Sequence, residues 1–319
     1  MDLERALLAA IEADPWEDSN WAVLADWLDD TSQPARAELV RLFLQLRRPT
    51  SDAAWPSLEQ QLRDLVAAGF CLPLPRRRLA IGPDLGLEFV QIPPGSFYMG
   101  TPLTEERRDE DEGPVHPVTL TRPFWLGIFP VTQAQWEAVT ATQAPGRFRG
   151  GDRPVEGISW HTAMEFVSDL QARFRWKCQL PTEAQWEYAC RGLTSTPFHY
   201  GPDLSSLQAN FDGNFPYGAA ATGPWLHQTS PLGAYPPNLF GLFDMHGNVW
   251  EWCADWYNDS YYESSPVDDP SGPFTGALRV LRGGSWYSYS WTCRSGGRER
   301  FSPDSGSGNY GFRLAMQDD

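Results

Sequence analysis

The C-terminal stretch 279–315 constrains this chain most, because two kinds of position alternate along it. Between residues typical of a rigid frame lie two runs, 287–290 and 305–310, drawn mainly from Tyr, Ser, Gly and Asn. Tyr supplies rigid contact area and the small polar residues supply adaptable hydrogen bonds, so this composition is typical of a binding surface. The alternative is a flexible linker. The frame residues that interrupt the runs are Arg282, Gly283, Gly284, Trp286, Trp291, Cys293, Arg294, Arg298, Pro303, Asp304, Gly311, Phe312 and Arg313.

Charge and composition exclude several classes of function. The formal net charge of -16 makes a sequence-independent grip on nucleic acid unfavourable, because phosphate binding needs clustered Lys and Arg. No apolar stretch approaches the roughly 20 residues that span a bilayer, and the first 20 residues do not have the pattern of a signal peptide. We therefore expect no membrane association and a cytoplasmic location. The five Cys are scattered without a C-x-x-C pair, which argues against a disulfide framework or a zinc site.

The N-terminal part has the apolar spacing of amphipathic helices. Positions 2–48 carry three such stripes, and 58–68 carries a weaker one. A Pro- and Arg-rich stretch, 71–80, then interrupts the periodicity. We predict a helical module over 1–75 and a second domain over 76–319. The module either docks onto a partner or packs against the second domain, and its stripes fit both.

The second domain mixes strand and helix signals. Residues 87–99 predict a β-hairpin around Pro-Pro-Gly, and 118–132 is strand-like. The charged segment 104–113 predicts a solvated surface loop. Residues 193–241 show no periodicity, and such a long loop needs aromatic side chains, a bound ion or a function to hold it.

Three helices are predicted in this domain. One begins near Gln133 and a second runs from Ser159 to about Phe174. The third follows Thr182, which has capping-box spacing to Gln185, and Gly192 can close it. A short ordered segment over 244–257 and a core strand near 278–286 complete an α+β pattern.

Several motifs appear in an order that resembles one known family. They are GSFYMG, PVEGISWHTA, LPTEAQWEYACRG, PPNLFGLFDMHGNVWEWCADWY, VLRGGSW and NYGFRLA. Over 84–319 this order resembles the formylglycine-generating-enzyme (sulfatase-modifying factor) family, which implies a C-type-lectin-like α+β fold. The layout of 279–315 also resembles the variable region of diversity-generating retroelement variable proteins. That resemblance implies a scaffold whose C-terminal residues can be diversified.

The family's oxidase chemistry carries over poorly. This chemistry depends on two copper-binding cysteines just after the Gly-Gly-Ser segment. In this chain the corresponding positions are occupied by Ser, Tyr or residues adjacent to them, so the cysteine pair is missing. Cys293 aligns with a structural cysteine of the family, and a two-thiolate copper site cannot be built from one thiol. A related branch uses an iron site of several His, whereas the five His of this chain are isolated in sequence. We therefore predict no enzyme and no copper or iron. The alternative is a metal-dependent oxidase or hydroxylase of this family.

The resemblance and the composition together predict a protein ligand on the C-terminal face. Tyr287, Tyr289, Phe301 and Tyr310 are expected to be its aromatic hot spots. Arg282, Arg294 and Arg313 are expected in or under the sheet, paired with carboxylates such as Asp304 or Glu251. The predicted contact residues are Tyr287, Ser288, Tyr289, Ser290, Thr292, Ser295, Gly297, Glu299, Phe301, Ser305, Ser307, Asn309 and Tyr310.

The resemblance also implies a structural Ca²⁺ and a cysteine pair. Carried over by position, the ion's ligands are Asp244, Gly247, Val249 and Glu251, and oxygen donors of this kind suit Ca²⁺. The alternative is a loop held by hydrogen bonds of Asn248 and Glu251 alone. A second calcium site of the family would begin at Asn210, but its downstream Asp is missing, so we do not expect it. Cys190 and Cys293 match a bonded pair of secreted family members and are expected here as neighbouring thiols.

Overall fold

The computed structural model describes residues 3–48 and 54–317, beginning with a helical region. The helices are α1 (Leu3–Ala13), α2 (Asp18–Asp30), α3 (Pro34–Leu46) and α4 (Trp55–Ala67). The apolar stripes are buried as the spacing predicts: Trp21, Leu24 and Leu28 of α2 have no measurable exposure. Among the described residues, none of the helices is both long and apolar enough to cross a membrane.

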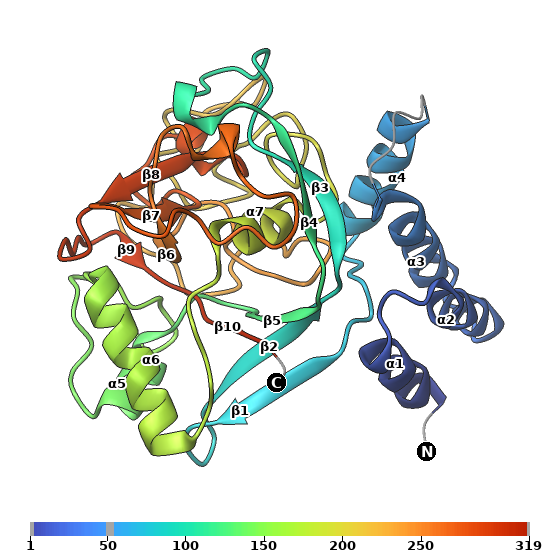
Figure 1. The fold of residues 1–319 in the computed structure, drawn as a ribbon, viewed down its shortest axis with the longest axis horizontal. Coiled ribbons are helices and arrows are strands. Elements are labelled where there is room, and N and C mark those ends of the chain that lie inside the picture. Colours follow the sequence, from blue (N-terminus) through green and yellow to red (C-terminus); the bar gives the residue numbers. More distant parts are fainter. Residues whose placement is uncertain (1–2, 49–53, 318–319) are drawn as a thin grey trace.

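The helical region packs against the rest of the chain (Figure 1). One continuous apolar core contains Leu39 and Phe43 of α3 together with Val90, Ile92 and Phe97 of the second region. The Trp16 indole also donates a hydrogen bond to the carbonyl of Thr121 at 3.1 Å. Packing, one of the two expected alternatives, is therefore present, while a partner for the module stays a prediction.

The second region contains three small sheets. The first has the order β1-β2-β5-β10, the second pairs β3 with β4, and the third has the order β8-β7-β6-β9. Every pairing is antiparallel except β6 with β9. The strands are β1 (Arg76–Ala80), β2 (Gly86–Ile92), β3 (Gly95–Met99), β4 (His116–Leu120), β5 (Phe124–Gly127), β6 (Trp250–Trp256), β7 (Arg279–Arg282), β8 (Arg298–Phe301), β9 (Tyr310–Gly311) and β10 (Ala315–Met316).

The predicted hairpin over 87–99 is wrong. Strand β2 pairs with β1 and β5, whereas β3 pairs with β4 in another sheet. Pro93 and Pro94 lie between the two strands. Because proline fixes φ near -65° and has no N–H to donate, this pair carries the chain onward in extended form instead of turning it back.

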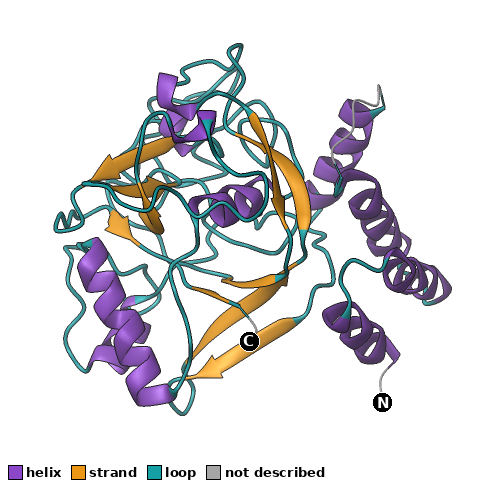
Figure 2. Cartoon of the chain, viewed as in Figure 1, coloured by secondary structure: helices purple, strands orange, loops and turns teal. Residues whose placement is uncertain are grey.

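The predicted helices are confirmed. They are α5 (Gln133–Thr140), α6 (Trp160–Phe174) and α7 (Glu183–Arg191). Thr182 and Gln185 form the expected capping box, and Gly192 ends α7 with a φ of 52°, a left-handed conformation that favours glycine. Residues 193–241 form no helix or strand and cross the molecule as long loops, as Figure 2 shows.

The acidic segment 104–113 is not simply a solvated loop. It contains the 3-10 helix η1 (Glu110–Glu112), in which Asp111 and Glu112 are buried. The carboxylates of Glu105 and Glu112 each lie 2.7 Å from a guanidinium nitrogen of Arg294. This local acidity is buried because the chain supplies a distant Arg to neutralise it.

Candidate functional site

Buried ion pairs form the frame of the C-terminal stretch. Both terminal nitrogens of Arg294 donate to the carboxylate of Glu112, each at 2.7 Å. The guanidinium also donates to the Trp291 carbonyl at 2.6 Å, which ties the stretch to itself. Breaking a buried pair leaves an uncompensated charge, so this arrangement holds the segment in one position.

A second set of pairs joins β7 and β8 to α7. Arg282 donates to Glu187, and Arg298 lies 2.7 Å from Glu183. Burial alone would raise the pKa of Glu187, but Arg191 and Arg282 lower it below its usual value. Both strands are therefore bound to the helix by charged groups as well as by packing.

The frame arginine Arg313 is paired with Glu251, as predicted. Arg313 donates from Nε to Oε2 at 2.6 Å and from Nη2 to Oε1 at 2.7 Å. Asp304, the other expected partner, is largely exposed and lies 3.6 Å from His161 Nε2. A buried guanidinium needs a buried carboxylate, and the loop that carries Asp304 lies at the surface.

On this frame the first run stands out into solvent. Tyr287 is 62% exposed and Tyr289 is 43% exposed. Below them, the Ser285 N–H donates to the Ser288 hydroxyl at 3.0 Å, and the Ser288 N–H donates to the Ser285 carbonyl at 3.0 Å. The two tyrosines thus sit on a closed turn, which lowers the entropy cost of ordering them against a partner.

Beside the tyrosines is a hollow of about 370 Å³. Five of the predicted contact residues line it, together with two Trp and an Asp that the sequence did not single out. Its lining is Asp212, Trp225, Trp250, Tyr287, Ser288, Tyr289, Thr292 and Glu299.

The aperiodic loop 193–241 supplies further aromatic groups. Trp225 donates from its indole to the Trp286 carbonyl at 2.9 Å, and its ring centre is 5.9 Å from that of Tyr287. Phe215 is 42% exposed, and its ring centre is 4.5 Å from that of Tyr289. Aromatic residues in a loop without periodicity were the sequence signal for this role. We call Phe215, Trp225, Tyr287, Tyr289 and Trp291 the aromatic surface.

Four predicted contact residues do not reach the surface. Ser290, Ser295, Gly297 and Tyr310 are buried. The ring of Tyr310 lies in the apolar core, 5.6 Å from the centre of Trp252, and its backbone forms β9. The other three are held by backbone hydrogen bonds: the Ser290 N–H donates to the Phe215 carbonyl, the Ser295 N–H donates to the Pro197 carbonyl, and the Gly297 carbonyl accepts from Arg282. These four therefore belong to the frame.

The remaining predicted contact residues are partly or largely accessible. Phe301 is 38% exposed at the end of β8. Ser288, Thr292, Glu299, Ser305, Ser307 and Asn309 are half-buried. The candidate surface therefore keeps nine of the thirteen positions and gains Phe215 and Trp225.

Several of the predicted calcium ligands already take part in hydrogen bonds within the protein. Asp244 is buried and accepts from the Gly233 N–H at 3.2 Å, and burial raises its pKa to about 6. Gly247 and Val249 lie in the same loop, and the Gly247 N–H donates to Gly283. Both oxygens of Glu251 accept from Arg313, and Oε2 also accepts from the Trp186 indole at 2.7 Å.

Glu251 in this arrangement does not fit a calcium ligand, since its carboxylate serves Arg313. Within residues 3–48 and 54–317, no group of three or more His, Cys, Asp and Glu side chains could hold a metal. Nearby, the Oδ1 atom of Asn210 is buried without a hydrogen-bond partner among these residues. Calcium stays a prediction: if it binds, a chelator will lower the thermal midpoint, and an unchanged midpoint would favour the ion-free loop.

The two cysteines that are expected to be neighbours, Cys190 and Cys293, both lie beside His246. Cys190 and Cys293 are both buried and free. The Cys190 sulfur lies 3.8 Å from His246 Nδ1, and the same nitrogen lies 2.7 Å from the Cys293 carbonyl oxygen. His246 also stacks on His199 with ring centres 4.8 Å apart, so these two histidines, isolated in sequence, meet in the fold.

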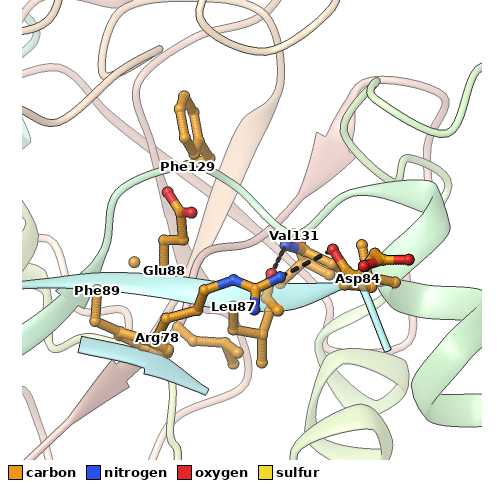
Figure 3. A pocket seen from close by; sticks show the side chains of 12 residues that line it. Arg78, Asp84, Leu87, Glu88, Phe89, Phe129 and Val131 are labelled. Carbon is orange, nitrogen blue, oxygen red and sulfur yellow. Dashed lines mark hydrogen bonds between the residues drawn. The ribbon is translucent and has the colours of Figure 1, made fainter. Parts of the chain in front are cut away.

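Another pocket, of about 280 Å³, lies away from this surface (Figure 3). Arg78, Glu88 and Phe129 are among its lining residues, and Arg78 donates to the Asp84 carbonyl at 2.9 Å. Because none of its lining residues lines the hollow, it forms no part of the candidate surface.

Residues 84–318 match the family model of the sulfatase-modifying factor enzyme 1-like domain. A formylglycine-generating enzyme of Streptomyces coelicolor is 35% identical over 284 residues, covering 72% of this chain and 89% of that protein. Variable protein 1 of Treponema denticola superposes with a TM-score of 0.64 at 25% identity, covering 76% of this chain and 99% of its own. PvdO from Pseudomonas aeruginosa gives the same TM-score at 30% identity, covering 76% of this chain and 98% of its own.

These relatives confirm the expected fold and correct one expectation. The solved structures share the formylglycine-generating-enzyme-like, C-type-lectin-like architecture. The prediction that the chain is no enzyme is contradicted by curated relatives named formylglycine-generating enzyme. The missing cysteine pair argues only against a two-thiolate copper site. It is no argument against catalysis in general. By its sequence match and its architecture, the chain belongs to the sulfatase-modifying factor enzyme 1-like family.

Proposed function

We propose that this chain binds a protein partner through the aromatic surface and its hollow. The observation that carries the proposal is the exposure of Tyr287 and Tyr289 on a turn closed by Ser285 and Ser288. Exposed tyrosines on a rigid frame combine large contact area with a small entropy cost, which is the pattern of binding hot spots.

The charge of the hollow indicates what the partner presents. Asp212 and Glu299 line it together with four aromatic side chains. A Lys or Arg side chain of the partner would gain both carboxylate attraction and contact with ring faces. We therefore propose a basic side chain, flanked by apolar residues, as the group that enters the hollow.

The surface positions are also suited to diversification. Tyr287, Ser288, Tyr289 and Thr292 line the hollow, whereas the arginines below them are buried. Substitutions at exposed positions away from caps and cores usually change stability by less than about 0.5 kcal/mol. The likeness to variable protein 1 of Treponema denticola supports this finer proposal, that the surface is one a diversity-generating retroelement can rewrite.

Selection from a displayed library of random peptides tests the binding proposal. Enriched peptides should contain Lys or Arg beside an apolar residue. The substitutions Tyr287→Ala and Tyr289→Ala should each weaken binding about 30-fold, which corresponds to about 2 kcal/mol.

Tyr98→Ala is the matched control. This tyrosine is 57% exposed and lies in β3, away from the aromatic surface, so its loss should leave peptide affinity unchanged. Enriched peptides that bind both surface variants as tightly as the original protein would refute the proposal.

The names of the relatives favour a second candidate function. A formylglycine-generating enzyme of Streptomyces coelicolor is 35% identical, so generation of formylglycine in a bound protein is the catalytic alternative. Incubation with a sulfatase-derived peptide, followed by an aldehyde-trapping reagent and mass spectrometry, tests it. Metal analysis of the purified protein in parallel shows whether copper or iron accompanies any activity.

A further inference from the structure

We infer that the junction between the helical region and the second region binds a small carboxylate with an apolar body. A pocket of about 310 Å³ lies there, where α3 and α4 approach β3 (Figure 1). Its lining is Leu46, Trp55, Ser96, Phe97, Tyr98, Gly100, Pro102, Val115, Tyr188, Arg191, Leu193, Thr194 and Ser195. It shares none of these residues with the hollow of the aromatic surface.

The walls of this junction pocket are mostly apolar. Leu46 and Trp55 come from the helical region, and Phe97 comes from β3. The Tyr188 ring packs on Phe97 with ring centres 5.4 Å apart. Tyr98 and Val115, which also line the pocket, are 57% and 40% exposed, so apolar groups there remain open to solvent. Such walls suit an aromatic ring or a short hydrocarbon chain.

One side of the pocket carries donors without partners. Tyr188 and Arg191 are three positions apart on α7, a spacing that places them on the same face. The Tyr188 hydroxyl is buried and has no hydrogen-bond partner among the described residues. Arg191 uses Nε and Nη2 for Glu187 and the Gly100 carbonyl, and its Nη1 makes no hydrogen bond within the described chain. The Tyr188 hydroxyl is the buried donor of the two. A buried donor without a hydrogen-bond partner costs about 1–3 kcal/mol, so an acceptor beside it would be stabilising.

The charge beside these donors favours an anion. Arg191 lines the pocket and pairs with Glu187, a carboxylate that it shares with Arg282. Among the described residues that line the pocket, Arg191 is the one with a charged side chain, and together with the Tyr188 hydroxyl it favours a carboxylate as the polar end of the ligand.

Both regions of the chain build this pocket, so a bound ligand would also hold them together. A ligand that binds only the folded, docked arrangement raises stability in proportion to its occupancy. Binding at the junction should therefore raise the thermal midpoint, which gives a readout that needs no enzymatic activity.

Calorimetric titration with 2-naphthoate tests the assignment. We expect saturable 1:1 binding and a rise in the thermal midpoint, with 2-naphthamide, the neutral isostere, at least about tenfold weaker. Tyr188→Phe should weaken 2-naphthoate binding roughly three- to tenfold through the lost hydrogen bond while leaving the thermal midpoint of the free protein unchanged.

A matched pair of valine variants separates the pocket from general surface effects. Val115→Trp places a bulky ring at the pocket and should weaken binding at least about tenfold. Val267→Trp makes the same change at a valine that is 50% exposed and does not line the pocket, and it should bind like the original protein.

Three results would overturn the inference. The first is the absence of saturable binding by 2-naphthoate. The second is equal affinity for the amide, which would remove the role of the charge. The third is unchanged affinity in Val115→Trp, which would place the binding elsewhere.

Discussion

The two Tyr/Ser/Gly/Asn runs of the C-terminal stretch have similar composition but place their tyrosines differently. In the first, 287–290, Tyr287 is 62% exposed and Tyr289 is 43% exposed. In the second, 305–310, Tyr310 is 6% exposed and lies in the core. The first run presents its two tyrosines to solvent, whereas the second turns its tyrosine into the core and leaves Ser305, Ser307 and Asn309 half-buried.

Backbone pairing explains the difference. In the second run the Ser307 carbonyl accepts from the Gly157 N–H at 2.9 Å, and the Asn309 carbonyl accepts from the Trp250 N–H at 2.8 Å. The first bond ties the run to the loop before α6 and the second ties it to β6, beside which Tyr310 lies in the core.

The first run is bonded to the loop 193–241 instead, since the Asp212 N–H donates to the Ser288 carbonyl at 2.9 Å and the Ser290 N–H donates to the Phe215 carbonyl at 3.3 Å. This pairing leaves Tyr287 and Tyr289 exposed to solvent. Composition therefore indicates what a run can contact, and pairing decides whether it does.

Among the tests of this difference, Tyr310→Ala is expected to have the largest effect on stability. Removing a core aromatic side chain should cost about 3–5 kcal/mol of unfolding free energy, because it leaves a cavity beside Trp252. Denaturant unfolding measures this loss, and Tyr310→Phe, which keeps the ring, is the control. A loss below about 1 kcal/mol for the alanine variant would place Tyr310 with the exposed tyrosines.

The next test is Gly306→Ala in the second run. A Cβ at Gly306 would lie 2.8 Å from the Gly157 carbonyl oxygen, so the backbone must shift. We expect a loss of about 1–3 kcal/mol, in the range of overpacked sites. Gly82→Ala is the control, since its Cβ would meet only Leu85 at an ordinary 3.5 Å. Equal stability of the two variants would show that the second run is free to move.

A smaller effect is expected from pH, through the carboxyl group beneath Gly308. Glu156 is fully buried, and burial raises its pKa despite hydrogen bonds from the Arg147 and Phe148 N–H groups. A raised pKa in the folded state stabilises at low pH, and this contribution is lost as pH rises from about 4.5 through the folded-state value. The stability of the original protein should therefore fall relative to that of Glu156→Gln as pH rises. A constant difference between the two across this range would contradict the assignment.

The smallest effect on stability is expected at the first run. Tyr287→Ala should change the free energy of unfolding by less than about 0.5 kcal/mol, because the side chain is mostly in solvent. The same denaturant experiment measures it beside Tyr310→Ala. A loss of unfolding free energy close to that of Tyr310→Ala would contradict the difference in burial between Tyr287 and Tyr310.

Local signals in the sequence predicted the helices of this protein well. The capping box of Thr182 and Gln185, the stop at Gly192 and the stripe of α2 are all present as expected. Each depends on residues within a few positions of one another, so short-range geometry is enough to specify them.

Long-range partners could not be found in the same way. The hairpin over 87–99 failed because β2 and β3 find partners in different sheets. The acidic segment 104–113 is partly buried because Arg294 reaches it from nearly two hundred residues away. In both cases the sequence next to the segment gives no indication of its distant partner.

The sequence by itself determined the family, the α+β class, the helix boundaries and the place of the aromatic residues along the chain. Only the tertiary structure decided which tyrosines face solvent, which carboxylate pairs with each arginine, and where the helical region meets the second region to enclose a pocket. The physical reason is that side-chain type fixes what a residue can contact, whereas exposure and charge pairing depend on segments that folding brings together from far apart in the chain.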